Sequence, residues 1–222
     1  KLAHENGTKV IVDNVLASPI LQKPIKLGAD IVMYSATKHI DGQGRVLGGA
    51  ILGSQKFCDK IIKPFIRNTG PSISPFNAFQ IMQGIETLPL RMDRICENSI
   101  KIAEFLSGHA KVSWVNYAGL TSHPDHALSK KFMAGKASGI LNFGLEGGQE
   151  AGTQFQDALN LFTRLVNIGD CKSLACHPAS TTHRQLTKEE LKSAGVTPDM
   201  VRLSIGIEHI DDLIQDLEQA LS

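Results

Sequence analysis

Two short apolar segments, at residues 8–13 and 30–35, constrain the fold more than any other feature of the sequence. Each contains consecutive Val, Ile or Met residues, without alternation between apolar and polar positions. Such runs are typical of strands in a sheet that is covered on both faces. A third apolar run at residues 47–53 follows a glycine-rich turn. The segments between and after these strands carry helical patterns, so the sequence predicts an α/β protein.

The rest of the chain is predicted to mix helices and strands. Helices are expected at 55–66 and from Pro75 to about Leu106, with a break at Pro89, because proline lacks the amide donor that a helix interior needs. Further strands are predicted at 112–115, 138–145 and 201–207, and helices near 150–162, 188–194 and 210–221. We therefore expect two domains, residues 1–105, which include the connecting helix, and a smaller α+β domain at residues 106–222.

Composition excludes several classes of protein. The 222 residues carry 23 basic and 22 acidic side chains, and no basic block is present, so neither nucleic acid nor an anionic membrane is an expected partner. No apolar run approaches the ~18 residues that cross a bilayer. The four cysteines lack metal-binding spacing, so we expect no metal and reduced thiols in a cytoplasmic protein.

The first residues have the pattern of a helix interior. The sequence opens at Lys1 without a helix cap, and Gly7 is typical of the residue that ends a helix. We therefore expect that an N-terminal portion of the natural polypeptide is missing from this sequence.

Lys38 is the strongest candidate for a chemical role. It follows a strand end, and the hydroxyl residues Ser35 and Thr37 precede it. Pyridoxal phosphate requires such a set, an amine that forms a Schiff base and short donors for the phosphate. By itself, Lys38 is read more simply as a solvated lysine in a turn.

Asp13 provides a second element of the same pattern. Its carboxylate ends the first predicted strand, and ligands bind at the carboxyl ends of parallel strands. A carboxylate that faces the pyridine nitrogen keeps this nitrogen protonated. Taken alone, Asp13 is read more simply as a turn or helix-capping residue, but together with Lys38 it favours a pyridoxal phosphate site.

Several longer strings carry a family resemblance. The chain resembles the Cys/Met-metabolism family of pyridoxal phosphate enzymes, in order and along nearly its whole length, in the strings Val12-Asp13-Asn14, Ser35-Ala36-Thr37-Lys38, Gly48-Gly49-Ala50, His177-Pro178-Ala179-Ser180-Thr181-Thr182-His183 and Val201-Arg202-Leu203-Ser204-Ile205-Gly206-Ile207-Glu208. The resemblance implies an aspartate-aminotransferase-like fold (fold type I), with part of the large domain and the C-terminal small domain.

The resemblance also implies roles for individual residues. Lys38 becomes the Schiff-base lysine and proton carrier, and Asp13 the partner of the ring nitrogen. Ser35 and Thr37 become phosphate ligands. The substrate α-carboxylate is expected to bind Arg202, whose planar guanidinium suits bidentate contact, together with Asn167 and Thr182. For His39, His177 and His183 we expect packing or hydrogen-bonding roles.

The reaction that the resemblance implies is γ-replacement in methionine biosynthesis, in which O-succinylhomoserine and sulfide give homocysteine and succinate. The short stretch between Gly53 and Thr69 leaves no room for an insertion associated with O-acetylhomoserine enzymes, which favours the succinyl ester. The acetyl ester, or cysteine as nucleophile in a cystathionine γ-synthase reaction, are the alternatives.

The family further implies a homotetramer whose subunits share active sites, and activity only when the N-terminal part is present. A hypothesis of another class is a catalytically silent α/β fragment that only binds or assembles.

Overall fold

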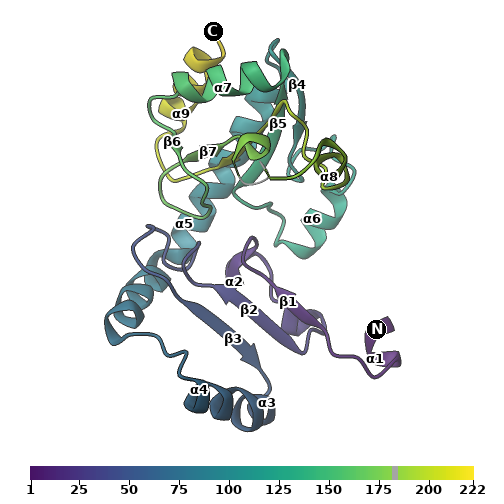
Figure 1. The fold of residues 1–222 in the computed structure, drawn as a ribbon, viewed down its shortest axis with the longest axis vertical. Helices are drawn as coiled ribbons and strands as arrows, with labels where there is room; N and C mark the ends of the chain where they lie inside the picture. Colours follow the sequence, from purple (N-terminus) through teal and green to yellow (C-terminus); the bar gives the residue numbers. More distant parts are fainter. Residues whose placement is uncertain (182–184) are drawn as a thin grey trace. The chain divides into compact units, whose positions relative to one another are not determined.

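In the computed structural model, which describes residues 1–181 and 185–222, the chain divides into two units, Lys1–Pro89 and Leu90–Ser222 (Figure 1). The N-terminal unit contains a sheet of three strands, β1 (Ile11–Asp13), β2 (Ile31–Ser35) and β3 (Gly49–Gly53), in the order β1-β2-β3. β1 runs parallel to β2 and β3 antiparallel to it. The two strands predicted to carry Asp13 and Lys38 are therefore neighbours, as expected.

The helical segments of this unit are short. They are α1 (Leu2–Glu5), α2 (Ser18–Leu21), the 3-10 helix η1 (Pro24–Leu27), α3 (Gln55–Phe57), the π-helix η2 (Cys58–Ile62) and α4 (Lys63–Thr69). The last three follow one another directly, so the helix predicted at 55–66 continues to Thr69. It ends where Gly70 adopts a φ of 81°.

Some apolar side chains of this sheet are exposed among the described residues of this unit. Met33 and Ile51 lie opposite each other on β2 and β3, and their side chains are 43% and 51% exposed. Ile11 on β1 is 59% exposed. The apolar runs predicted the strands correctly, but no described segment buries these side chains.

The long helix α5 (Pro75–Ser107) corrects a second expectation. It continues through Pro89, where a break was predicted. A proline inside a helix costs about 3 kcal/mol, but Leu88 and Met92 on either side are almost completely buried. Their packing offsets the local penalty.

The predicted domain boundary between residues 105 and 106 lies near the end of this helix and stays a prediction.

The C-terminal unit contains a sheet of five strands in the order β4-β5-β8-β7-β6. These are β4 (Val112–Asn116), β5 (Ile140–Leu145), β6 (Thr163–Arg164), β7 (Leu174–Cys176) and β8 (Met200–Ser204). The helices are α6 (His126–Phe132), α7 (Gly148–Ala158), the 3-10 helix η3 (Pro178–Ser180), α8 (Lys188–Ser193) and α9 (Ile210–Leu221). The α+β mixture was predicted, but α6, β6 and β7 were not.

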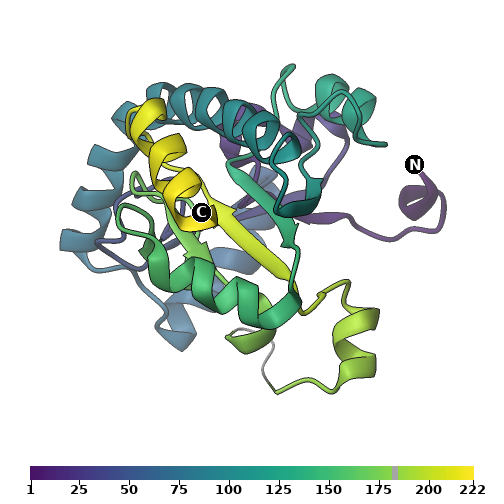
Figure 2. The same ribbon diagram turned by 90° about the horizontal axis from the view of Figure 1, so that it is seen from above.

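The core of the C-terminal unit lies between this sheet and the helices that pack on it. α5 contributes Ile102 and Leu106, α9 contributes Leu213 and Leu217, and Phe143 on β5 is fully buried among them. α9 also packs against α7, and Figure 2 shows these two helices side by side in yellow and green. The packed core gives β8, the central strand, a fixed position.

Candidate functional site

Lys38 lies in a tight turn that begins where β2 ends. Its backbone N–H donates to the carbonyl of Ser35 over 3.2 Å, and its own carbonyl accepts from the N–H of Gly42 over 2.8 Å. The Lys38 side chain is half-buried. With both backbone groups bonded, the turn holds the start of this side chain rigidly at the carboxyl edge of β2.

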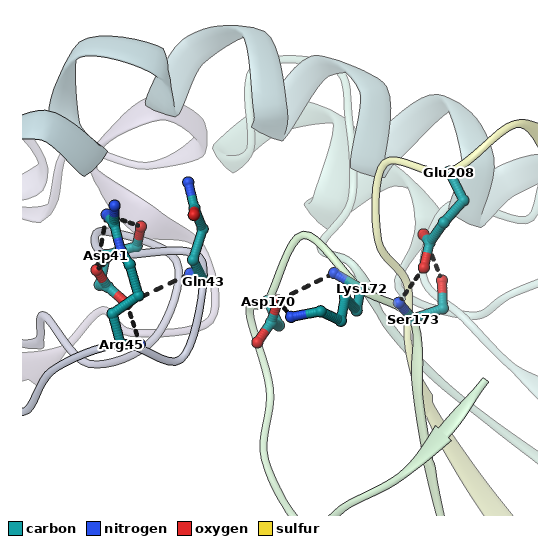
Figure 3. Close-up of polar contacts among 7 residues, drawn as sticks. All are labelled: Asp41, Gln43, Arg45, Asp170, Lys172, Ser173 and Glu208. Carbon is teal, nitrogen blue, oxygen red and sulfur yellow. Dashed lines mark hydrogen bonds and ion pairs between the residues drawn. The ribbon is translucent and has the colours of Figure 1, made fainter. Parts of the chain in front are cut away.

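A buried carboxylate holds the second half of the turn together. Asp41 is fully buried, and its carboxylate accepts from the backbone N–H of Gln43 and Arg45 over 3.3 and 2.9 Å, and from Nε of Arg45 over 2.9 Å (Figure 3). The Arg45 guanidinium also donates to the carbonyl of Gln80 over 3.2 Å. Asp41 therefore links the lysine turn to α5 through Arg45. The sequence showed this segment only as a glycine-rich turn.

Gly84 brings α5 close to the same turn. A Cβ atom at this position would lie 2.4 Å from the carbonyl oxygen of Ile40 and 2.7 Å from that of Asp41. No side chain fits there, so a glycine is required.

The two hydroxyl residues expected to bind phosphate lie beside this turn. Thr37 Oγ1 donates to the carbonyl of Gly48 over 3.3 Å and accepts from the N–H of the same residue over 3.1 Å. Because its one hydroxyl proton is already donated, Thr37 would have to exchange this bond to donate to a phosphate. Ser35, the last residue of β2, lies opposite Gly49 in the β2–β3 register.

Asp13 ends β1 at the same edge of the sheet as Lys38. In the parallel register it lies opposite Met33, two residues before the end of β2. Its side chain is exposed, and Oδ1 accepts from the N–H of Val15 over 3.1 Å. Among residues 1–181 and 185–222 no hydrogen bond of the second carboxylate oxygen is found, so it can accept from a ligand that approaches this edge.

Asn14, which was not predicted to have a role, fixes the chain just after Asp13. It is buried, its N–H donates to the carbonyl of Met33 over 3.0 Å, and its Nδ2 donates to the phenolic oxygen of Tyr34 over 3.0 Å. These two partners lie 19 and 20 residues away, so no local sequence pattern could reveal them.

In the C-terminal unit, Arg202 and Asn167 are brought together. Arg202 lies on β8, half-buried, and its guanidinium donates to the backbone carbonyl of Asn167 over 3.4 Å. It lies opposite Asn142 on β5 and Cys176 on β7. Burial raises the pKa of the Cys176 thiol, and the positive charge of Arg202 acts in the opposite direction.

The segment that follows Asn167 is held by the end of β8 and the residues after it. The N–H of Gly169 donates to Ser204 Oγ over 3.0 Å. The Glu208 carboxylate accepts from the N–H of Ser173 over 2.6 Å and from its hydroxyl over 3.0 Å (Figure 3). The string from Arg202 to Glu208 thus supplies both the arginine and the contacts that position its partner loop.

Among the histidines, His177 is fully buried and has the hydrogen-bonding role expected of it. Its Nε2 lies 2.7 Å from the carbonyl oxygen of Pro198, and its Nδ1 lies 2.8 Å from Ser180 Oγ. His39 is also buried. Thr182 and His183, for which roles were expected, lie outside the described residues.

The groups at the edge of β1 and β2 fit pyridoxal phosphate. They are an amine on Lys38, a carboxylate on Asp13 and a hydroxyl on Ser35, all at the ends of two neighbouring parallel strands. Among residues 1–181 and 185–222, no three His, Cys, Asp or Glu side chains are grouped so that they could hold a metal ion. In the same part of the chain, no helix combines the length and the apolar character needed to span a membrane.

Comparison with known families identifies the class of protein. The sequence model of the family of Cys/Met metabolism PLP-dependent enzymes matches residues 1–222. The chain therefore belongs to this family, and its expected cofactor, pyridoxal 5'-phosphate, is confirmed.

Curated relatives divide among several activities. The chain is 46% identical to the O-succinylhomoserine sulfhydrylase of Mycobacterium tuberculosis, over all of this chain and 55% of the relative. It is 45% identical to the O-acetyl-L-homoserine sulfhydrylase of Leptospira meyeri (59% of the relative) and 45% identical to the L-methionine gamma-lyase of Pseudomonas putida (56%), again over all of this chain. The chain thus spans little more than half the length of these relatives.

Solved structures support the predicted fold class. The cystathionine gamma synthase of Xanthomonas oryzae pv. oryzae matches with a TM-score of 0.94 and 41% identity, over 99% of this chain and 56% of that one. The cystathione gamma lyase CalE6 of Micromonospora echinospora also matches with a TM-score of 0.94, at 37% identity, over 99% of this chain and 57% of that one. The fold of a type I pyridoxal phosphate enzyme is confirmed.

Proposed function

We propose that the whole protein is an O-succinylhomoserine sulfhydrylase, which replaces the succinyloxy group of O-succinylhomoserine by sulfide to give homocysteine and succinate. The observation that carries the reaction class is the shared edge of β1 and β2, where Asp13 and the Lys38 turn lie at neighbouring strand ends. We expect this activity when the polypeptide includes the segments that its longer relatives contain.

Lys38 carries the central chemical role in this proposal. Its Nζ is the point of covalent attachment of pyridoxal phosphate, which supplies an electron sink for the charge left on the substrate Cα when a proton is removed. During the reaction, Nζ would take the proton from the substrate Cα and return protons to the reacting carbons. The hydrogen bonds at both sides of its backbone fix the point from which this side chain extends.

Three other residues of the N-terminal unit would hold the cofactor. The Asp13 carboxylate would keep the proton on the pyridine nitrogen, because an opposite charge favours the protonated form. Ser35 would donate to the phosphate, and Thr37 would do so after exchanging its bond to Gly48.

Arg202 and Asn167 would bind the substrate in the C-terminal unit, together with Thr182. A guanidinium grips a carboxylate through two parallel hydrogen bonds, and Arg202 is oriented by the Asn167 carbonyl. The remaining Arg202 donors are directed to the α-carboxylate of the substrate in this proposal.

Alignment length favours the succinyl over the acetyl ester. The alignment with the O-acetyl-L-homoserine sulfhydrylase extends over 261 positions, against the 222 residues of this chain, whereas that with the O-succinylhomoserine sulfhydrylase extends over 226. This difference supports the absence of an insertion that the acetyl-ester enzyme carries.

The alignment with L-methionine gamma-lyase covers 222 positions, so elimination from methionine is a second candidate that uses the same residues.

We also propose a cytoplasmic homotetramer, as the family resemblance implies.

Steady-state assays with the two esters, each combined with sulfide or cysteine, and with methionine alone test the proposal. Homocysteine from O-succinylhomoserine and sulfide, with at least tenfold lower kcat/KM for the other combinations, supports it. Cystathionine as the main product, a preference for the acetyl ester, or release of methanethiol from methionine would each overturn the proposed specificity. Absence of any turnover by a cofactor-loaded full-length protein would favour the silent fragment.

A further inference from the structure

A cavity in the C-terminal unit lies apart from all the residues proposed for the reaction. Its volume is about 200 Å³, and it is open to solvent on one side and lined by the second half of α5, the turn after β4, α6 and the segment that follows α6. Cys96 and Ile100 contribute from α5, Tyr117 from the turn, and His126 and Lys130 from α6. Most of the surface that these segments present is apolar, so the cavity favours an organic ligand over a hydrated ion.

The walls of the cavity are built by unusual backbone. A Cβ atom on Gly119 would lie 2.4 Å from Cε1 of Tyr117, so the absence of a side chain lets the Tyr117 ring fold back along the wall. Beside the opposite wall, Ala134 adopts a φ of 53°, which is rare for a residue other than glycine. Ser129 Oγ holds this segment by donating to the carbonyl of Lys136 over 2.9 Å. Strained backbone that is held in place in this way often accompanies a ligand site.

One shielded polar atom at the cavity lacks a hydrogen-bond partner in the described part of the chain. Nδ1 of His126 is shielded from solvent and makes no hydrogen bond there. Three charged residues also line the cavity: Lys136, which pairs with Asp93, Glu97, which pairs with Arg94, and the exposed Lys130, for which no ion pair is found among residues 1–181 and 185–222. A ligand that carries a negative charge and accepts hydrogen bonds would satisfy the shielded imidazole nitrogen and pair with the exposed Lys130 ammonium.

We propose that this cavity is a binding site for a small aromatic monocarboxylate. An apolar cavity of about 150 Å³ in another protein accommodates benzene, so the volume here suits one substituted ring. The ring would pack against Ile100 and Tyr117. The carboxylate would lie at His126 and Lys130.

Phenylacetate is a suitable probe, with phenylacetamide as its uncharged counterpart. Binding to the cofactor-loaded full-length protein is measured by calorimetry and by ligand-observed NMR. We expect saturable binding of phenylacetate at concentrations up to about 10 mM, because so small a ligand binds weakly, and binding of phenylacetamide about fivefold weaker.

Two substitutions on the same helix provide a matched comparison. Lys130→Gln should weaken phenylacetate binding about fivefold, whereas Lys131→Gln, whose lysine does not line the cavity, should leave it unchanged. Ile100→Trp should abolish binding by filling the cavity, and Ala118→Leu offers a smaller filling change if the first variant does not fold.

Equal binding of phenylacetate and phenylacetamide, equal effects of the two lysine substitutions, or binding that survives the filling variants would overturn the proposal. So would the absence of saturable binding. Because this readout does not depend on turnover, it is independent of the outcome for the proposed function.

Discussion

The side chain of Asn14 joins the ends of β1 and β2 by donating from Nδ2 to the phenolic oxygen of Tyr34 over 3.0 Å. The same amide group donates to the backbone carbonyls of Ser18 and Gln22 over 3.0 and 3.1 Å. Both Asn14 and Tyr34 are buried. Since Asn14 directly follows Asp13, this contact fixes the position from which the Asp13 carboxylate leaves the sheet.

We expect Asn14→Ala to reduce the free energy of unfolding by about 1–3 kcal/mol, because the Tyr34 hydroxyl and two carbonyls lose their buried donor. Denaturant titration monitored by circular dichroism gives the value. Asn6→Ala is the control, since the exposed Asn6 amide bonds to the Leu2 carbonyl of its own short helix. Equal losses from the two substitutions would show that the β1–β2 link is unimportant.

The Asp41–Arg45 pair should be far more sensitive to substitution than a surface pair of the same spacing. Asp41→Ala leaves the partly buried Arg45 guanidinium without its main partner and should cost about 3–5 kcal/mol of unfolding free energy. Asp59→Ala, which removes an exposed i,i+4 pair with Lys63, should have little effect. Similar midpoints of denaturation for the two variants would contradict the structural role of Asp41.

Alkaline pH should destabilise the C-terminal unit through Cys96. Burial raises the pKa of this thiol to about 12, above its value in the unfolded chain. As pH rises past about 8.5, the unfolded state loses the proton first, so stability is fully present below that pH and falls toward pH 12, by at most about 1.4 kcal/mol per unit.

Unfolding titrations between pH 8 and 11 compare the wild-type chain with Cys96→Ala. We expect a shallower decrease for the variant. Parallel pH dependences would mean that Cys96 does not carry this effect. Burial also raises the pKa of Tyr117, whose contribution starts at higher pH.

The strands of the N-terminal unit and the position of Lys38 could be predicted because their signals are local. Consecutive Val and Ile residues indicate a buried strand, and the glycines after Lys38 indicate the turn. Pro89 misled the prediction, since its local effect is outweighed by the burial of Leu88 and Met92.

Features that depend on distant partners could not be predicted. β7 has only three residues, and it is a strand because it pairs with β8 and β6. The buried state of Asp41 and the link from Asn14 to Tyr34 likewise depend on residues far along the chain. The meeting of Arg202 with Asn167, 35 residues apart, was implied only by family resemblance.

Arg202→Lys should be strongly unfavourable although the charge is kept. A lysine ammonium cannot form two parallel hydrogen bonds to a carboxylate. We expect a decrease in kcat/KM of at least a hundredfold, about 3 kcal/mol in transition-state binding, with an unchanged cofactor absorption spectrum. Exposed Arg94→Lys serves as the control. A variant at position 202 with normal kcat/KM would assign Arg202 a purely structural role.

Borohydride reduction of the cofactor-loaded protein, followed by peptide mapping, tests the role of Lys38 most directly. Reduction fixes pyridoxal phosphate permanently on the lysine that holds it. The site proposed at the edge of β1 and β2 predicts the pyridoxyl group on Lys38, loss of the visible absorbance band, and no labelling in Lys38→Ala. A pyridoxyl group on another lysine, such as Lys26, Lys56 or Lys130, would contradict the proposed site.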